Sequence, residues 1–255
     1  MLVDTHCHLD AKEFDTDRDA VVARSRDAGI SHIIVPSVKR ENFATVGALC
    51  RQYSGCHAAY GIHPMYVDGA VVEDLGVLRE TISREKPVAV GEIGLDRFVA
   101  ERDDARQAFY FVEQLKIARE FDLPVLLHVR RAVDPILKQL RLIRLPGGIA
   151  HAFNGSRQQA DEFIKLGFKL GFGGAMTWPR ATRLRELAAT LPLESIVLET
   201  DSPDIPPLWV GKDRNEPAEL MKIAQELAAI RGMPVEAVIE ATGSNAASVL
   251  PNASC

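Results

Sequence analysis

The stretch Asp4-Thr5-His6-Cys7-His8-Leu9-Asp10 follows the short apolar run Met1-Leu2-Val3. We interpret residues 2–8 as a strand that ends in a loop. Because strand side chains alternate in direction, His6 and His8 should point to one side and Cys7 to the other. Two imidazoles one residue apart at a strand end make one half of a metal site. The other ligands must therefore come from distant parts of the chain.

A short apolar run followed by an amphipathic segment recurs along the whole chain. The apolar runs predict strands at residues 2–5, 32–36, 56–62, 88–92, 124–128, 148–152, 168–172 and 195–200. The amphipathic segments predict helices near residues 15–28, 41–53, 71–84, 104–121, 131–143, 156–166, 180–190 and 216–231. Residues 234–250 predict one or two short closing helices.

This alternation favours one fold class, an α/β barrel. Runs such as residues 124–128 are apolar without full alternation, which is typical of parallel strands covered by helices. Eight such units in 255 residues predict one (β/α)8 TIM barrel, with residues 1–255 as a single domain. A doubly wound open sheet is the alternative.

Residues of metal-ligating type are placed at the ends of the predicted strands, where the active site of an α/β barrel lies. They are His6 and His8 after strand one, His63 after strand three, Glu92, His128 and His151 at the ends of strands four to six, and Asp201 after strand eight. The other two histidines, His32 and His57, fall at strand starts and so on the opposite face. This sorting predicts one cluster at one mouth of the barrel.

The ligand count indicates two metal ions. A catalytic zinc takes about three protein ligands, whereas four imidazoles and two carboxylates suit two ions that share a bridging group. Glu92 is the natural bridge, because a carboxylate has one oxygen for each ion. Asp201 could bind a metal and also accept the proton of the attacking water. Zn²⁺, Mn²⁺ or Mg²⁺ would suit such ligands.

Composition restricts the possible functions. The formal charge of −5 argues against holding nucleic acid by bulk positive potential, although bound cations would make the site itself positive. No run of 18 apolar residues and no signal peptide are recognised, so we expect no membrane span and a cytoplasmic protein. The cysteines Cys7, Cys50, Cys56 and Cys255 have no disulfide-framework spacing, so we expect reduced thiols.

Six motifs, in order, resemble those of the TatD family of metal-dependent hydrolases over nearly the whole chain. They are Asp4-Thr5-His6-Cys7-His8-Leu9-Asp10, Gly61-Ile62-His63-Pro64, Gly91-Glu92-Ile93-Gly94-Leu95-Asp96, His128-Val129-Arg130, His151-Ala152-Phe153-Asn154-Gly155 and Glu199-Thr200-Asp201-Ser202-Pro203. The resemblance implies a phosphodiester-cleaving deoxyribonuclease, often 3′-exonuclease-like. Its partner would be DNA or a small phosphodiester, and we expect a monomer or weak oligomer.

The resemblance also implies roles for individual residues. One ion would be held by His6, His8 and Asp201, and the other by His128 and His151, with Glu92 as the bridge. His63 would face a substrate phosphate, and Arg130 would lie close to it. The chain departs from the family at Asn154, at Val210, where an arginine is common, and at the extra residue Asp213. A missing cation and an added anion weaken the case for efficient DNA binding.

Two other functions fit parts of the pattern. A two-metal amidohydrolase or lactonase would use the same ligands, because the same activated water can attack either centre. Basic residues in the expected top-face loops favour phosphodiesters, and they are Arg97, Arg130, Arg157, Lys212 and Arg214. A non-catalytic barrel is disfavoured by the intact ligand set.

Two further carboxylates are predicted one layer below the ligands. Asp4 precedes His6 by two residues and Glu199 precedes Asp201 by two, so strand alternation directs both toward the barrel interior. Buried charge is costly without a partner, and metal-bound imidazoles commonly donate their second N–H to a carboxylate. We therefore expect Asp4 and Glu199 to orient ligands or neighbouring backbone.

Overall fold

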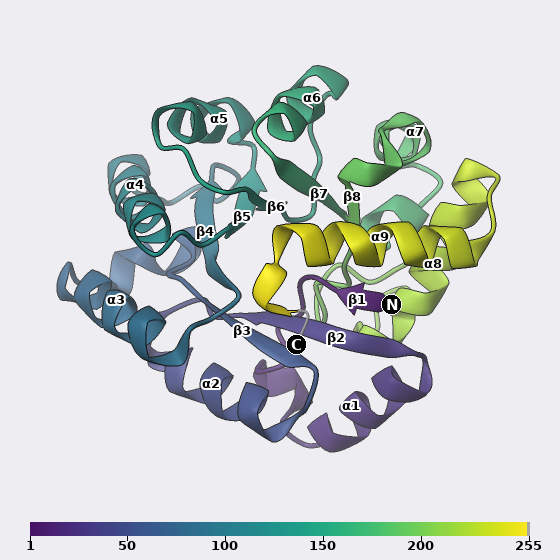
Figure 1. Cartoon of the computed structure of the whole chain (residues 1–255), viewed down its shortest axis with the longest axis horizontal. Helices are drawn as coiled ribbons and strands as arrows, with labels where there is room; N and C mark the ends of the chain where they lie inside the picture. Colours follow the sequence, from purple (N-terminus) through teal and green to yellow (C-terminus); the bar gives the residue numbers. More distant parts are fainter. Residues whose placement is uncertain (254–255) are drawn as a thin grey trace.

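Eight parallel strands form one sheet in the computed structural model, which describes residues 1–253 (Figure 1). The strands are β1 (Leu2–Asp4), β2 (Ile30–Pro36), β3 (Cys56–Tyr60), β4 (Ala89–Asp96), β5 (Val125–Arg130), β6 (Gly148–Ala150), β7 (Phe168–Phe172) and β8 (Ile196–Leu198). Each strand pairs in parallel with the next one in the chain, in the order β1 to β8. Such an order requires a crossover between every pair of strands.

The two outer strands meet and close the sheet into a barrel. The Thr5 N–H donates to Leu198 O at 3.0 Å, and the Asp201 N–H donates to His6 O at 2.8 Å, so hydrogen bonds run between the ends of β1 and β8. This closure confirms the predicted (β/α)8 barrel and excludes the open doubly wound sheet.

Helices surround the barrel and fill the crossovers (Figure 1). They are α1 (Arg18–Asp27), α2 (Phe43–Gln52), α3 (Glu73–Glu85), α4 (Asp104–Glu120), α5 (Val133–Leu142), α6 (Arg157–Lys165), α7 (Thr182–Thr190) and α8 (Leu220–Arg231). Short 3₁₀ segments lie in the connections, and they are η1 (Lys12–Phe14), η2 (Arg40–Asn42), η3 (Pro64–Gly69), η4 (Gly174–Thr177), η5 (Leu193–Ser195), η6 (Pro217–Glu219) and η7 (Pro251–Ala253).

The closing segment was predicted as one or two short helices over residues 234–250, and it forms one. This helix, α9 (Val235–Val249), has 15 residues and crosses the end of the barrel where the strands begin (Figure 1). Its buried residues Ala246 and Val249 join a cluster of inward-facing strand side chains that includes Val3, Leu126 and Val197. The interior is thus packed and covered at this end, which leaves the opposite mouth for the site.

Within residues 1–253, no helix is both long and apolar enough to cross a lipid bilayer. Cys7, Cys50 and Cys56 carry free thiols, and Cys255 lies outside the described residues.

Candidate metal centre

The segment after β1 places two imidazoles on one carboxylate. The strand itself ends at Asp4, yet residues 5–8 continue far enough to bring His6 Nε2 and His8 Nε2 each to 3.7 Å from Asp201 Oδ1. Cys7 faces the other way, with its Sγ 3.1 Å from Ser202 Oγ. The alternation expected from the sequence therefore holds beyond the end of the regular strand.

Glu92 lies between two groups of histidines. Its Oε2 is 3.1 Å from His6 Nε2 and 3.6 Å from His8 Nε2, whereas its Oε1 is 3.0 Å from His128 Nδ1 and 3.5 Å from His63 Nε2. The side chain is only 2% exposed, so both oxygens are committed to these neighbours. Glycines allow this dense packing: a Cβ at Gly94 would overlap the carbonyl oxygen of His128.

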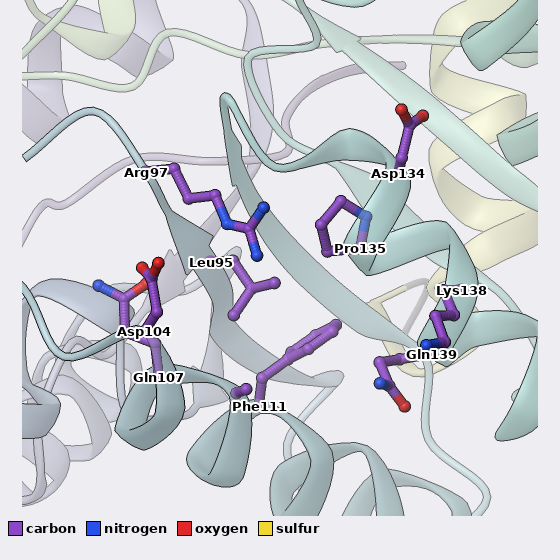
Figure 2. Close-up of a pocket in the computed structure, with 10 residues that line it drawn as sticks. Leu95, Arg97, Asp104, Gln107, Phe111, Asp134, Pro135, Lys138 and Gln139 are labelled. Atoms are coloured by element: carbon purple, nitrogen blue, oxygen red, sulfur yellow. The ribbon is translucent and has the colours of Figure 1, made fainter.

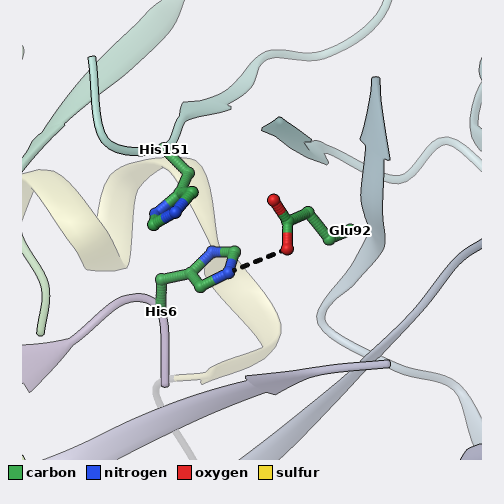
Figure 3. Close-up of side chains that lie close together, drawn as sticks. All are labelled: His6, Glu92 and His151. Atoms are coloured by element: carbon green, nitrogen blue, oxygen red, sulfur yellow. Dashed lines mark hydrogen bonds and ion pairs between the residues drawn. The ribbon is translucent and has the colours of Figure 1, made fainter. Parts of the chain in front are cut away.

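His151 lies against His6 rather than beside His128. The two rings stack with their centroids 3.6 Å apart, as Figure 3 shows together with the contact between His6 and Glu92. His151 Nε2 is 3.3 Å from Asp201 Oδ1. The mouth thus gathers all six predicted ligands, and His151 is grouped with His6 and Glu92.

His63 is also brought to the cluster, but as a hydrogen-bond donor. It caps the N-terminus of η3, where its Nδ1 accepts the Met65 N–H at 3.1 Å. Since Nδ1 acts as the acceptor, the hydrogen of the neutral ring is on Nε2, the atom that faces Glu92. A metal needs a ring nitrogen without hydrogen, so this arrangement disfavours His63 as a ligand and leaves it as a donor.

Arg130 lies at the rim, apart from the buried cluster. It ends β5 and is exposed, with its guanidinium carbon 4.2 Å from the centroid of the Phe98 ring. Arg131 contacts the same ring from 4.7 Å. Within residues 1–253, the Arg130 side chain forms no ion pair with a ligand of the cluster.

Asp96 is a site residue that the sequence-based ligand set lacks. Its Oδ2 lies 2.8 Å from His128 Nε2. We expected strand four to end at Glu92, but β4 continues to Asp96, because residues 93–96 pair with β5. Strand alternation could have identified it, since residues 92, 94 and 96 share one face.

The lower layer contains the two carboxylates that were expected there, with different partners. Asp4 accepts the Thr200 N–H at 2.9 Å, the Thr200 hydroxyl at 2.6 Å and the His6 N–H at 3.3 Å, so it orients backbone rather than an imidazole. Glu199 accepts the Ala152 N–H at 2.6 Å and places Oε2 3.1 Å from His151 Nδ1.

In this cluster, burial and the charges of neighbouring side chains shift the pKa values of several residues in opposite directions. Burial alone would raise the pKa values of Glu92 and Asp201, but the facing imidazoles lower both below their usual range. Burial lowers the pKa of His6 and of His63. At His151 the carboxylates of Glu199 and Asp201 outweigh burial and raise the ring pKa.

The donor set fits a divalent metal. Two groups without His63 have ligand atoms that all lie within 4.8 Å of one another: His6 with His8 and Asp201, and His6 with Glu92 and His151. Imidazoles with anionic carboxylates form the usual ligand set of such ions.

Comparisons with known proteins agree with this site. The sequence profile of the family described as "TatD related DNase" matches residues 3–251. The metal-dependent hydrolase YjjV of Escherichia coli K12 is 41% identical over 95% of both chains. Its crystal structure covers 98% of both chains with a TM-score of 0.95. A protein of Cronobacter sakazakii named "3′-5′ ssDNA/RNA exonuclease TatD" is 34% identical over 99% of both chains.

Proposed function

Because the chain belongs to the TatD-related DNase family of metal-dependent hydrolases, we propose that it is a two-metal phosphodiesterase. The substrate we propose is single-stranded DNA or a smaller phosphodiester. A single strand is favoured because the ligands lie in a barrel mouth, which a stacked duplex would enter poorly. A relative at 34% identity is named as an exonuclease for single-stranded DNA and RNA, which supports this class.

The orientation of Glu92 carries the two-metal proposal. One of its oxygens faces His6 and His8, and the other faces His128, which is the arrangement expected of a carboxylate shared by two ions. We assign His6, His8 and Asp201 to one ion and His128 and His151 to the other. The His151 assignment is the one that the geometry supports least, because its ring lies on His6.

The protein side chains would position the substrate and move protons. Two bound divalent ions would supply Lewis acidity and lower the pKa of the attacking water. The Asp201 carboxylate would accept the proton of that water, since the facing imidazoles outweigh burial, lower its pKa and keep it ionised. His63 would donate its Nε2 hydrogen to a phosphate oxygen. The ligands would suit Zn²⁺, Mn²⁺ or Mg²⁺.

Cations paired with exposed aromatic rings at the mouth support a nucleic-acid substrate. Lys39 lies 5.7 Å from the Tyr66 ring centroid, and Tyr66 is in turn 6.0 Å from the ring of His63. Arg130 and Arg131 flank Phe98 in the same way. Aromatic faces bind unstacked bases while cations bind the backbone. Of the other basic residues, Arg157 and Arg214 are ion-paired with Asp161 and Asp17.

The three departures from the family can now be placed. Asn154 accepts a hydrogen bond from Arg183 at 2.8 Å. The Asp213 N–H donates to Val210 O and closes a turn in the loop after β8. We propose that this loop contributes little to the binding of nucleic acid. A single-stranded substrate would then lie on the side of Tyr66 and Phe98.

Hydrolysis assays with metal-reconstituted protein test the substrate class. We expect cleavage of a single-stranded oligonucleotide or of bis(p-nitrophenyl) phosphate, lost on chelation and restored by added Zn²⁺, Mn²⁺ or Mg²⁺. A panel of lactones and amides is assayed in parallel. Hydrolysis of a lactone or amide without cleavage of any phosphodiester would establish the amidohydrolase alternative instead.

A further inference from the structure

A cavity of about 440 Å³ lies on the outer side of β4, between α4 and α5. Figure 2 shows Arg97 and Phe111 directed toward the space above Leu95, with Pro135 on its α5 side. Cavities of this size hold small organic ligands. It lies outside the metal cluster and shares none of the six ligands.

Three of the polar side chains that line this cavity have free hydrogen-bond donors. Within residues 1–253, the side chains of Arg97 and Lys138 form neither an ion pair nor a hydrogen bond. Gln107 is 4% exposed, and its Oε1 accepts the Asp96 N–H at 2.9 Å, which leaves its amide N–H groups without a protein acceptor.

The two acids that line the cavity are already engaged by other residues. Asp104 Oδ1 accepts from Arg102 Nε at 2.7 Å, and Asp134 Oδ1 accepts from Gln159 Nε2 at 2.9 Å. Arg97, Lys138 and the amide of Gln107 thus remain as donors for a ligand, beside the free amide of Gln139, so the site can take an anion. The rest of the lining is apolar and includes Leu95, Phe111 and Pro135, which suits a ring attached to that anion.

We propose that this cavity is a nucleotide-binding subsite, which takes a phosphate at Arg97 and the attached ring on the apolar floor. The choice of a nucleotide as the anion rests on the proposed function. Arg97 is next to Phe98, and Gln107 holds the backbone of Asp96, which contacts His128. The subsite therefore adjoins the edge of the barrel mouth, over which a single-stranded nucleic acid would reach the metal centre.

The nucleotide could be part of the strand or a free mononucleotide, and variants separate the subsite from the metal centre. Ala108 is exposed and lines the cavity, so Ala108→Glu puts bulk and negative charge into it without disturbing the core. Ala105→Glu is the matched control, since Ala105 is an exposed residue of the same helix outside the lining. Arg97→Gln removes one phosphate donor, and Arg119→Gln removes a charge from exposed α4 surface.

The first measurement is binding of thymidine 5′-monophosphate and fluorescein-labelled dT12 to metal-free protein, by calorimetry and by anisotropy. We expect Ala108→Glu and Arg97→Gln to weaken binding of at least one probe by about tenfold, as loss of a charged hydrogen bond would. Ala105→Glu and Arg119→Gln should bind like the native protein. Native affinity in Ala108→Glu, or an equal loss in Ala105→Glu, would overturn the proposal.

The second measurement identifies the source of the nucleotide with metal-loaded enzyme. If the subsite binds the strand, Ala108→Glu raises KM for dT12 and leaves the cleavage of dT2 unchanged. If it binds a free nucleotide, both KM values stay native while thymidine monophosphate binding is lost. An enzyme that cleaves no phosphodiester would contradict the proposed function, whereas binding to metal-free protein would still decide whether the subsite exists.

Discussion

Glu92 contacts both groups of histidines, so its replacement tests whether one carboxylate is shared by two metal ions. Glu92→Gln removes one anionic oxygen between His6 and His128, so we expect lower occupancy of at least one ion and strongly reduced hydrolysis with an intact fold. Metal content by mass spectrometry, activity and circular dichroism are the measurements. Full metal content with retained activity would mean that Glu92 is not the bridge.

Glu199 acts on the site through His151. Its Oε2 lies 3.1 Å from His151 Nδ1, so Glu199→Gln should weaken metal affinity by roughly 10–100-fold with little loss of fold. Competition of the apo variant with a chelating dye measures the binding constant. Glu194→Gln, an exposed change of the same charge, should bind metal as the native protein does. An unchanged constant in Glu199→Gln would assign Glu199 a role in backbone support alone.

Strand alternation accounts for how much of the site could be predicted residue by residue. It placed the six candidate ligands at one mouth and Asp4 and Glu199 beneath them. It missed the contact of Asp96 with His128, because the strand was ended four residues early. The partner of a buried carboxylate also depends on the neighbouring strands. Asp4 accepts a hydrogen bond from Thr200, just after β8, and not from an imidazole. The sequence around Asp4 does not indicate this partner.

At the scale of elements, β7 and β8 are fitted to each other around Glu199. A Cβ at Gly171 would overlap the Glu199 carboxylate, so Gly171→Ala should displace that carboxylate from His151. We expect reduced metal affinity together with a lower melting temperature. Gly76→Ala is the control, because a Cβ there meets nothing within 4 Å, and it should leave metal binding unchanged. Native metal affinity in Gly171→Ala would show that the Glu199 carboxylate can move away from β7 without any effect on metal binding.

Element boundaries were predictable only where the local pattern determines them. The apolar runs identified all eight strands, because most residues of the strands are buried on both faces of the sheet. For residues 234–250 the local pattern left open one helix or two, because the continuity of α9 depends on the barrel beneath it. Asn245 donates to Leu193 O and Ile196 O, both at 2.8 Å, and Gly243 allows the backbone of Met1 to approach closely. These contacts join segments about 50 residues apart or more, beyond the reach of local periodicity.

At the scale of the whole molecule, the end of the barrel opposite the metal centre carries a second titrating pair. His32 on β2 and His57 on β3 are half-buried, and His32 Nδ1 lies 2.8 Å from His57 Nε2. Burial lowers the pKa of both rings, the positive N-terminus adds to this effect at His32, and His32 adds to it at His57. One neutral ring can donate to the other, but two protonated rings cannot share this bond.

The sign of the resulting pH dependence follows from these lowered pKa values. A histidine with a lowered pKa in the folded state binds protons less readily than in the unfolded chain, where the pKa is about 6.5. Its stabilising contribution is therefore complete above about pH 6.5 and is lost as the pH falls below that value toward the folded-state pKa.

Between about pH 7.5 and about pH 5.5, we expect acidification to destabilise the metal-free native protein relative to His57→Gln, which keeps a hydrogen-bonding side chain but does not titrate, as measured by the urea midpoints of the two proteins. The histidines of the metal centre contribute equally to both proteins and cancel in the difference. Equal changes of the midpoint in the two proteins would show that this pair does not contribute to the pH dependence of stability.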